Sequence, residues 1–373
     1  MSKKRRRQAA RRDDMSSGVS GVEDLAFVAA LIGPGFGEVQ ERLATASVPV
    51  GERVKSRLEK LLTEAEREAG RDHREHHWIP QFWLREFADE GRQVGVVDPS
   101  GQTPERRCSA RRAAVARDLY AIRVERASAE AVSAFWERWM GVFEHEAACL
   151  FKDLACGDGH THPADASWRC LSDEDRLWLS MLFALQRVRT PKMIDAGIRS
   201  AVNIAQRFVD QMWSDDFTVT DDSMSVVPSL LPLAFGDAAL MSFFGRSWSL
   251  VTFPDGGLCV PWDSGLLCAP GATRGPLLAA PVGVGNAEAI LVPLAPNRLL
   301  LMHWEGDGYD PRDLRLPECT QRLAWEGSPL ICHPRDFATV SEIGSAALND
   351  LPRLHEQSAV SENIGQPVAL MPC

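Results

Sequence analysis

Apolar residues in the first part of the chain recur at helical spacing and predict amphipathic helices. A short apolar segment at 22–32 predicts a helix that the Gly-Pro-Gly sequence at 33–35 ends. Residues 51–69 predict a second helix, which stops at Gly70. Its apolar positions fall on one helical face: Val54, Leu58, Leu61, Leu62 and Ala65.

Three longer helical patterns follow between residues 128 and 212. The first covers about 128–155, begins at the candidate N-cap Ser128, and carries an uninterrupted apolar stripe. The second opens at Ser172, where acidic residues in the first turn resemble a capping box. Pro191 then either kinks this helix or begins another that reaches about Met212.

After residue 215 the pattern changes to short apolar segments separated by turn residues, which predicts strands. Segments 248–253 and 258–261 flank Pro-Asp-Gly-Gly and predict one hairpin, while 288–294 and 298–304 flank Ala-Pro-Asn and predict another. A helical half followed by a strand-rich half favours an α+β fold. We therefore expect the helical N-terminal half to pack on antiparallel hairpins of the C-terminal half.

The same patterns divide the chain into a central domain and flanking segments. Residues 1–20 are basic and then rich in Ser and Gly, which predicts a disordered tail. Residues 21–70 predict an N-terminal helical extension. Residues 71–350 predict a single α+β domain, helical over 71–215 and strand-rich over 216–350, before a C-terminal tail at 351–373.

Charge is spread unevenly along the 373 residues. The formal net charge is −10, yet residues 1–12 carry +7, so the rest of the chain carries −17. A body that acidic repels a phosphate backbone over most of its surface. The basic tail at 3–12 is a candidate contact to nucleic acid. Alternatively it is a solvated tail with no specific partner, because charges without aromatic residues specify little.

Cysteine content and hydropathy predict a cytoplasmic protein with no membrane partner. The nine cysteines are odd in number and form no C-x-x-C arrangement, which favours reduced thiols and argues against a zinc ribbon. Cys149 and Cys170 lie in apolar segments and are expected in the core. No apolar run reaches the roughly 18–20 residues of a membrane span, and the first residues lack a secretory signal pattern.

Histidines cluster just ahead of Pro80, which suits the first turn of a short helix. Trp83 and Phe87 are four residues apart and are expected to anchor that helix in the core. His76 and His77 then lie in extended backbone, where adjacent side chains face opposite sides. Either one of them faces a pocket as a metal ligand or general base, or both orient the chain by hydrogen bonding.

Acidic and basic candidates lie on the later helices. Glu137, Gly141 and Glu144 share one face of the 128–155 helix. The two carboxylates either contact a metal or substrate, or form the solvated edge of an amphipathic helix. Arg189 either holds a phosphate or carboxylate in its planar guanidinium, or complements a helix C-terminus.

The string H-H-W-I-P-Q-F-W-L-R-E-F at 76–87 resembles the opening motif of the domain of unknown function 4238 family. The resemblance covers about residues 76–305 and implies kinship with a mainly bacterial family that has no assigned activity. Later landmarks follow in the family's order: a strand at 91–98, Asp-Leu-Tyr at 118–120, spaced glutamates at 137 and 144, Arg-Thr-Pro at 189–191 and Val-Pro-Leu at 292–294.

Asp263 departs from the pattern that the resemblance implies. The family usually has an Asp after a Ser or Thr, on a strand that follows an aromatic one. Here Trp262 stands at the hydroxyl position and Pro261 precedes it. A polar role for Asp263 therefore follows from the resemblance less directly than the roles of the paired histidines.

The sequence holds no Walker A loop, dinucleotide fingerprint, nucleophile elbow or H-E-x-x-H motif. The leading hypothesis is a metal-dependent hydrolase of phosphodiesters or nucleic acid, in which His77 and Glu144 hold a divalent metal ion. The alternative is a non-catalytic protein that binds protein or nucleic acid. The residues expected to converge in a catalytic site are His76, His77, Glu144, Arg189 and Asp263.

Overall fold

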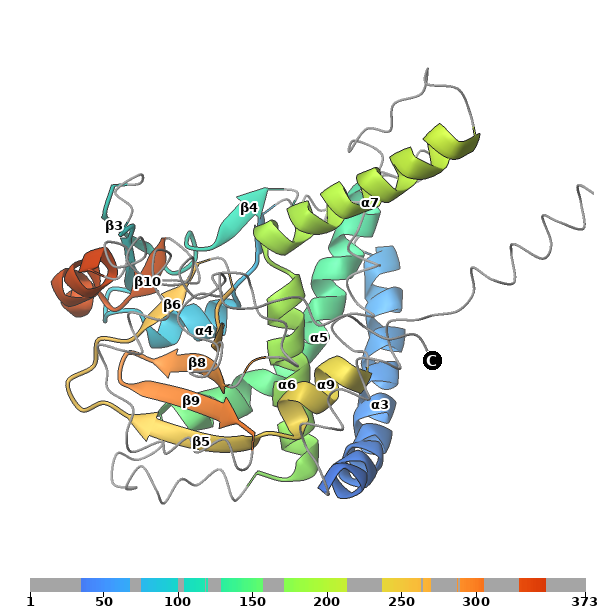
Figure 1. Cartoon of the computed structure of the whole chain (residues 1–373), viewed down its shortest axis with the longest axis horizontal. Helices are drawn as coiled ribbons and strands as arrows, with labels where there is room; N and C mark the ends of the chain where they lie inside the picture. Colours follow the sequence, from blue (N-terminus) through green and yellow to red (C-terminus); the bar gives the residue numbers. More distant parts are fainter. Residues whose placement is uncertain are drawn as a thin grey trace, which may run out of the picture.

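A computed structural model of the chain shows helices stacked beside antiparallel sheets (Figure 1). The predicted α+β class is confirmed. The helix predicted at 22–32, Ser128, Cys170 and both predicted tails lie outside the described residues, and the predicted domain boundaries stay a prediction. The structure describes residues 35–67, 75–99, 104–117, 119, 129–156, 171–212, 237–262, 264–269, 287, 289–304 and 329–346.

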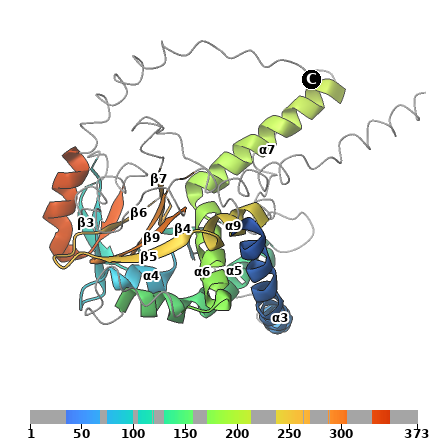
Figure 2. The same ribbon diagram turned by 60° about the horizontal axis from the view of Figure 1, so that its bottom comes forward.

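The helical part is built on three long helices that pack against one another: α3 (Phe36–Arg67), α5 (Ala129–Cys156) and α6 (Asp173–Val188). A short helix, α9 (Asp237–Phe244), packs against α6 and α3. In both ribbon views α7 (Pro191–Met212) points away from this group (Figures 1 and 2). Within the described residues, no helix has the length and apolar character of a membrane span.

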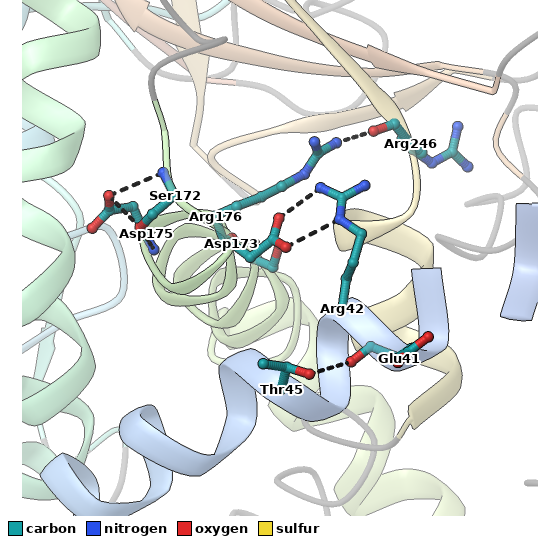
Figure 3. A network of polar contacts seen from close by, with 9 residues as sticks. Glu41, Arg42, Thr45, Ser172, Asp173, Asp175, Arg176 and Arg246 are labelled. Carbon is teal, nitrogen blue, oxygen red and sulfur yellow. Dashed lines mark hydrogen bonds and ion pairs between the residues drawn. The ribbon is translucent and has the colours of Figure 1, made fainter. Parts of the chain in front are cut away.

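The start of α6 is fixed by the predicted capping box. The hydroxyl of Ser172 accepts a hydrogen bond from the backbone of Asp175 at 3.1 Å, and the Asp175 carboxylate accepts one from the Ser172 backbone at 3.2 Å. Arg42 of α3 donates to both carboxylate oxygens of Asp173, at 2.6 and 3.0 Å (Figure 3). These contacts tie the first turn of α6 to α3.

Two helical predictions need correction. Helix α3 begins at Phe36, whereas the sequence predicted a start near residue 51. Pro49 lies inside this helix, although proline ordinarily breaks helices. The apolar face explains this length, because it includes the buried Leu43 and Val50. Cys149 was expected in the core but is exposed, because it lies on the solvent side of α5.

The strands form three antiparallel sheets. A small sheet joins β1 (Glu75–His77) to β4 (Val115–Arg117). The second has the order β3-β2-β10-β6 and the third β5-β9-β8-β7. Their bounds are β2 Gln93–Val97, β3 Arg106–Ser109, β5 Ser247–Thr252, β6 Cys259–Pro261, β7 Leu267–Ala269, β8 Ala289–Ala295, β9 Arg298–His303 and β10 Leu330–Cys332.

One predicted hairpin is confirmed and the other is wrong. Strands β8 and β9 pair as expected, with a register shift between Pro293 and Ala295. Strand β5 pairs with β9 instead of β6, and β6 pairs with β10 in a different sheet. The intervening turn has positive φ at Gly256 and Gly257, at +74° and +100°. It is held against the β8–β9 turn, where Leu258 donates to the carbonyl of Pro296 at 2.8 Å.

Trp83 joins the helical and sheet parts from α4 (Gln81–Glu86), the short helix that follows Pro80. Its side chain is 0% exposed, and its indole N–H donates to the carbonyl of Pro293 in β8 at 2.7 Å. Its ring lies 4.9 Å from Phe151 of α5 and 6.2 Å from Phe183 of α6, between ring centroids. The predicted anchoring by Trp83, and by the equally buried Phe87, is confirmed.

We expect Trp83→Ala to lower the free energy of unfolding by about 4 kcal/mol, because it removes a large ring from a fully packed site. Trp83→Phe should cost less, since a ring remains but the Pro293 carbonyl loses its donor. Urea unfolding measures both. Trp139→Ala on α5 is the control, and its partly buried ring should cost less than Trp83→Ala; equal losses would contradict the assigned role.

Candidate functional site

The two adjacent histidines face opposite sides of β1, as extended backbone requires. His76 is 0% exposed and His77 is half-buried. In the β1–β4 pair His76 stands opposite Ala116 and His77 opposite Val115. The His76 ring therefore faces the core, whereas His77 faces the same side of the strand as the exposed Glu75.

Two side chains from the end of α6 hold the backbone that follows these histidines. Arg189 donates through Nη2 to the carbonyl of His77, and Gln186 donates through Nε2 to the carbonyl of Trp78 at 2.8 Å. Positions 186 and 189 are three residues apart, so both side chains leave the same face of the helix. The orientation of the His77–Trp78 segment therefore depends directly on the last turn of α6.

Arg189 also forms an ion pair with Glu144 of α5 through Nη1. The Arg189 side chain is 4% exposed and the Glu144 side chain 24% exposed. Three of the predicted catalytic residues therefore meet at one junction of β1, α5 and α6. Arg189 is the C-cap residue of α6, and its side chain reaches both β1 and α5.

The half-buried imidazole of His77 is hydrogen-bonded to Gln81, which lies four residues later in the sequence. Nε2 of His77 and Nε2 of Gln81 are 2.7 Å apart. Arg85 donates to the amide oxygen of Gln81 at 3.2 Å, which orients the amide so that its N–H faces the imidazole. The Nε2 atom of His77 consequently accepts this hydrogen bond, as a neutral imidazole does.

The pKa of His77 lies below its ordinary value of 6.5, mainly because burial disfavours the charged ring. The positive charge of Arg189 lowers this pKa further. A backbone hydrogen bond at Ala113 and the carboxylates of Glu144 and Glu75 act in the opposite direction. At neutral pH the ring is therefore uncharged and has the form that can accept a proton.

Trp262 brings a fourth segment to the junction. Its carbonyl accepts a hydrogen bond from the indole N–H of Trp78 at 2.7 Å, and the two rings meet edge to face at 5.3 Å. Asp263, the next residue, lies outside the described residues. Nearby, Gly265 has φ +71°, and a side chain there would lie 3.1 Å from Gln186, so only glycine allows this approach.

Sequence reasoning found three residues of this junction and missed two. Gln81 and Gln186 carry no charge and disturb no apolar periodicity, so nothing in the pattern distinguished them. Their positions gave the available signal: Gln81 is four residues after His77, and Gln186 is three before Arg189. The second interval places both side chains on one helical face, whereas His77 lies on β1 and Gln81 begins α4.

A metal centre of three or more ligands is not found in the part of the chain that the structure describes. No group of three His, Cys, Asp or Glu side chains there is arranged to hold an ion. The side chain of Glu137, like Asp263, lies outside the described residues. The predicted metal ligands His77 and Glu144 are both present at the junction, where Arg189 already neutralises Glu144.

Comparison with known proteins places this junction within a family. The sequence model of the family described as "Protein of unknown function (DUF4238)" matches residues 75–310, which agrees with the span expected from the paired-histidine motif. No curated protein and no solved structure matches the chain. The matched span contains β1, α5, α6 and the segment around Trp262.

We expect Glu144→Gln to lower the free energy of unfolding by about 3 kcal/mol, because it leaves the buried Arg189 without its counter-charge. The matched control is Glu146→Gln on the same helix. Glu146 pairs with Arg53 and Arg57, whose side chains are half exposed, so its loss should cost less than about 1 kcal/mol. Urea unfolding of both variants measures the difference, and equal costs would contradict a structural role for the Arg189–Glu144 pair.

The lowered pKa of His77 predicts that stability falls as the solution becomes acidic. Below about pH 6.5 the unfolded chain protonates this ring more readily than the folded chain, so the contribution is present above that pH and is lost as pH falls through the folded pKa. His77→Asn should therefore reduce the loss of unfolding free energy between pH 7 and 5.

Urea unfolding at several pH values measures this difference. Burial and Arg335 also lower the pKa of His333, which contributes with the same sign in the parent and in the variant. The comparison of the two proteins therefore isolates His77. An unchanged pH dependence in His77→Asn would contradict the proposed burial of the neutral ring.

Proposed function

The chain belongs to the DUF4238 family, and we propose that it is a hydrolase of phosphodiesters in which His77 acts as the general base. The observation that supports this proposal is the meeting of His77, Glu144 and Arg189, which come from three elements. These three residues are far apart in the sequence, so the tertiary structure brings them together. The half-buried, uncharged imidazole can take a proton from water through Nε2, once the Gln81 amide that donates to this atom moves aside.

Within this proposal the other residues position the base. Arg189 uses its terminal nitrogens on Glu144 and on the His77 carbonyl, so it fixes the backbone of the base instead of binding a free phosphate. Gln81 donates to Nε2 of the resting imidazole and fixes its tautomer, and it must release this atom before the base acts. His76 packs in the core and holds β1 in place. We assign the role of a second acidic group to Asp263, because the neighbouring Trp262 contacts Trp78.

The proposal also has a metal-dependent form, in which His77 and Glu144 bind a divalent metal ion. Imidazole and carboxylate are both common metal donors, and a bound ion would lower the pKa of a coordinated water. In this form Glu144 would divide its charge between Arg189 and the metal. Activity assays with and without chelator separate this form from metal-free general-base catalysis.

One observation favours a different function, that of a non-catalytic binding protein. Arg189 and Glu144 satisfy each other in a nearly buried pair, and such pairs are often structural. In that case the paired-histidine motif would serve to lock β1 and α4 onto α6. The protein would then act through its surface, including the basic tail at 3–12, on a protein or nucleic acid.

We expect the full-length chain to hydrolyse phosphodiesters, and His77→Asn to lower kcat by about 100-fold or more, the typical contribution of a general base. The substrates are bis(p-nitrophenyl) phosphate, single-stranded DNA and RNA, each with Mg²⁺, Mn²⁺, Zn²⁺ or a chelator. The matched control is His145→Asn, which removes an exposed histidine next to Glu144 on α5 and should leave kcat unchanged.

Two outcomes would overturn the hydrolase proposal. One is the absence of cleavage of every substrate under all four conditions. The other is cleavage that His77→Asn leaves intact while the variant remains folded. Either result would favour the binding protein, in which loss of residues 2–12 weakens a salt-dependent interaction with nucleic acid.

A further inference from the structure

Four exposed arginines lie on β3 and on the turn that connects it to β4. We propose that this surface, the β3 arginine surface, binds the phosphate backbone of a nucleic acid and presents it to His77. Its use as a substrate surface rests on the proposed hydrolase function, whereas the binding itself does not. The four residues are Arg106, Arg107, Arg111 and Arg112.

The local charge is opposite in sign to that of the whole protein. Between residues 104 and 114 the four arginines are accompanied by one acid, Glu105, so this segment carries +3 in a chain of net charge −10. Neutralising an anion needs this kind of local excess, because the acidic remainder of the chain repels phosphates. The segment is therefore a basic surface set into an acidic protein.

The four guanidinium groups are available to a ligand. In the described part of the chain, their side chains make neither ion pairs nor hydrogen bonds, and the contacts of these four residues are made by their backbones. On α3, by contrast, Arg53 and Arg57 share the carboxylate of Glu146. Unpaired arginines on a surface lose little when they bind an anion, since no internal partner has to be displaced.

The geometry of β3 suits a repeating anion. Among the described strands it is an edge strand that pairs with β2, with Arg106 opposite Val96 and Arg107 opposite Gly95. Extended backbone rises about 3.3 Å per residue and directs successive side chains to opposite faces, so Arg106 and Arg107 flank the edge of β3 from its two faces, and Arg111 and Arg112 follow on the turn. A linear polyanion that runs along this edge can contact them in succession, whereas a single small anion cannot.

This surface adjoins the candidate site through the chain itself. The turn that carries Arg111 and Arg112 continues to Ala113, whose backbone raises the pKa of His77 and therefore lies next to its ring. The next residue, Ala114, accepts a hydrogen bond from the backbone of Trp78 at 3.1 Å. The turn arginines that would hold a phosphate are consequently one and two residues before Ala113, where the segment next to His77 begins.

Nucleic acid fits this surface better than a membrane does. The guanidinium group of arginine is a planar double donor that matches phosphate oxygens, and a nucleic acid supplies phosphates at regular intervals. A membrane-binding surface would also expose apolar side chains beside its cations. Among the described residues, the large apolar side chain that is exposed is Val48 of α3, outside this surface.

The test replaces all four arginines by glutamine in the full-length chain and measures binding to labelled DNA. Fluorescence anisotropy is recorded with a single strand and a duplex of about 20 nucleotides, longer than a single module usually covers. The salt concentration runs from about 50 to 200 mM. Loss of four phosphate contacts should make the slope of log K against log salt shallower by about 3.

The matched control removes the same charge from another surface. R53Q/K55Q/R57Q/K60Q on α3 lowers the net charge by the same four units as R106Q/R107Q/R111Q/R112Q, and it should leave the salt slope unchanged. R111Q/R112Q alone should produce about half of the effect. None of these side chains is buried, so each variant is expected to fold like the parent chain. Thermal melting of each variant checks this.

Three outcomes would overturn the inference: no DNA binding by the parent chain, equal slope changes in both four-residue variants, or loss of binding to phosphatidylserine vesicles with unchanged DNA binding. The hydrolase proposal is tested separately by His77→Asn, which should lose cleavage yet keep the parent salt slope. An arginine effect on binding without any phosphodiester cleavage would therefore refute the hydrolase and retain the nucleic-acid surface.

Discussion

Arg189 carries a positive charge into the interior, and a buried charge is tolerated only where an opposite charge and acceptors meet it. Glu144 supplies the charge and the His77 carbonyl supplies an acceptor, so α5, α6 and β1 must adopt one mutual arrangement. The short sequence Arg189-Thr190-Pro191 also sets two helix boundaries. Arg189 ends α6 and Pro191 begins α7, and between them the Thr190 hydroxyl accepts a hydrogen bond from the backbone of Met193. Helix boundaries and site geometry are thus encoded together.

Local chemistry explains which elements could be predicted. The capping box of α6 depends on Ser172 and Asp175 alone, so sequence was sufficient to find it. The β8–β9 hairpin needs only its own turn, but the partner of β5 is decided by contacts with β9, about 50 residues away. The strand preference around Pro-Asp-Gly-Gly was recognisable there, whereas the pairing was not, because two positive-φ glycines direct the chain into another sheet.

The site could be predicted to a similar extent and for a similar reason. Charged and aromatic residues in the paired-histidine motif, together with Glu144 and Arg189, have chemistry that singles them out in a sequence. The two glutamines act through hydrogen bonds to a carbonyl and to an imidazole, and neither partner can be inferred without the fold. The burial that separates His76 from His77 follows from strand alternation, but which ring faces inward is set by the pairing of β1 with β4.

The candidate base and the β3 arginine surface obey different physical rules, although one strand and turn connect them. The base needs partial burial, because desolvation keeps its imidazole uncharged near neutral pH. The arginines need full hydration when unoccupied, since a buried guanidinium would require its own carboxylate, as Arg189 does. The β3–β4 turn satisfies both demands by exposing Arg111 and Arg112 while directing Ala113 and Ala114 toward β1. In the proposed hydrolase, the turn would hold a phosphate chain on the hydrated side while the proton acceptor keeps its partly buried environment.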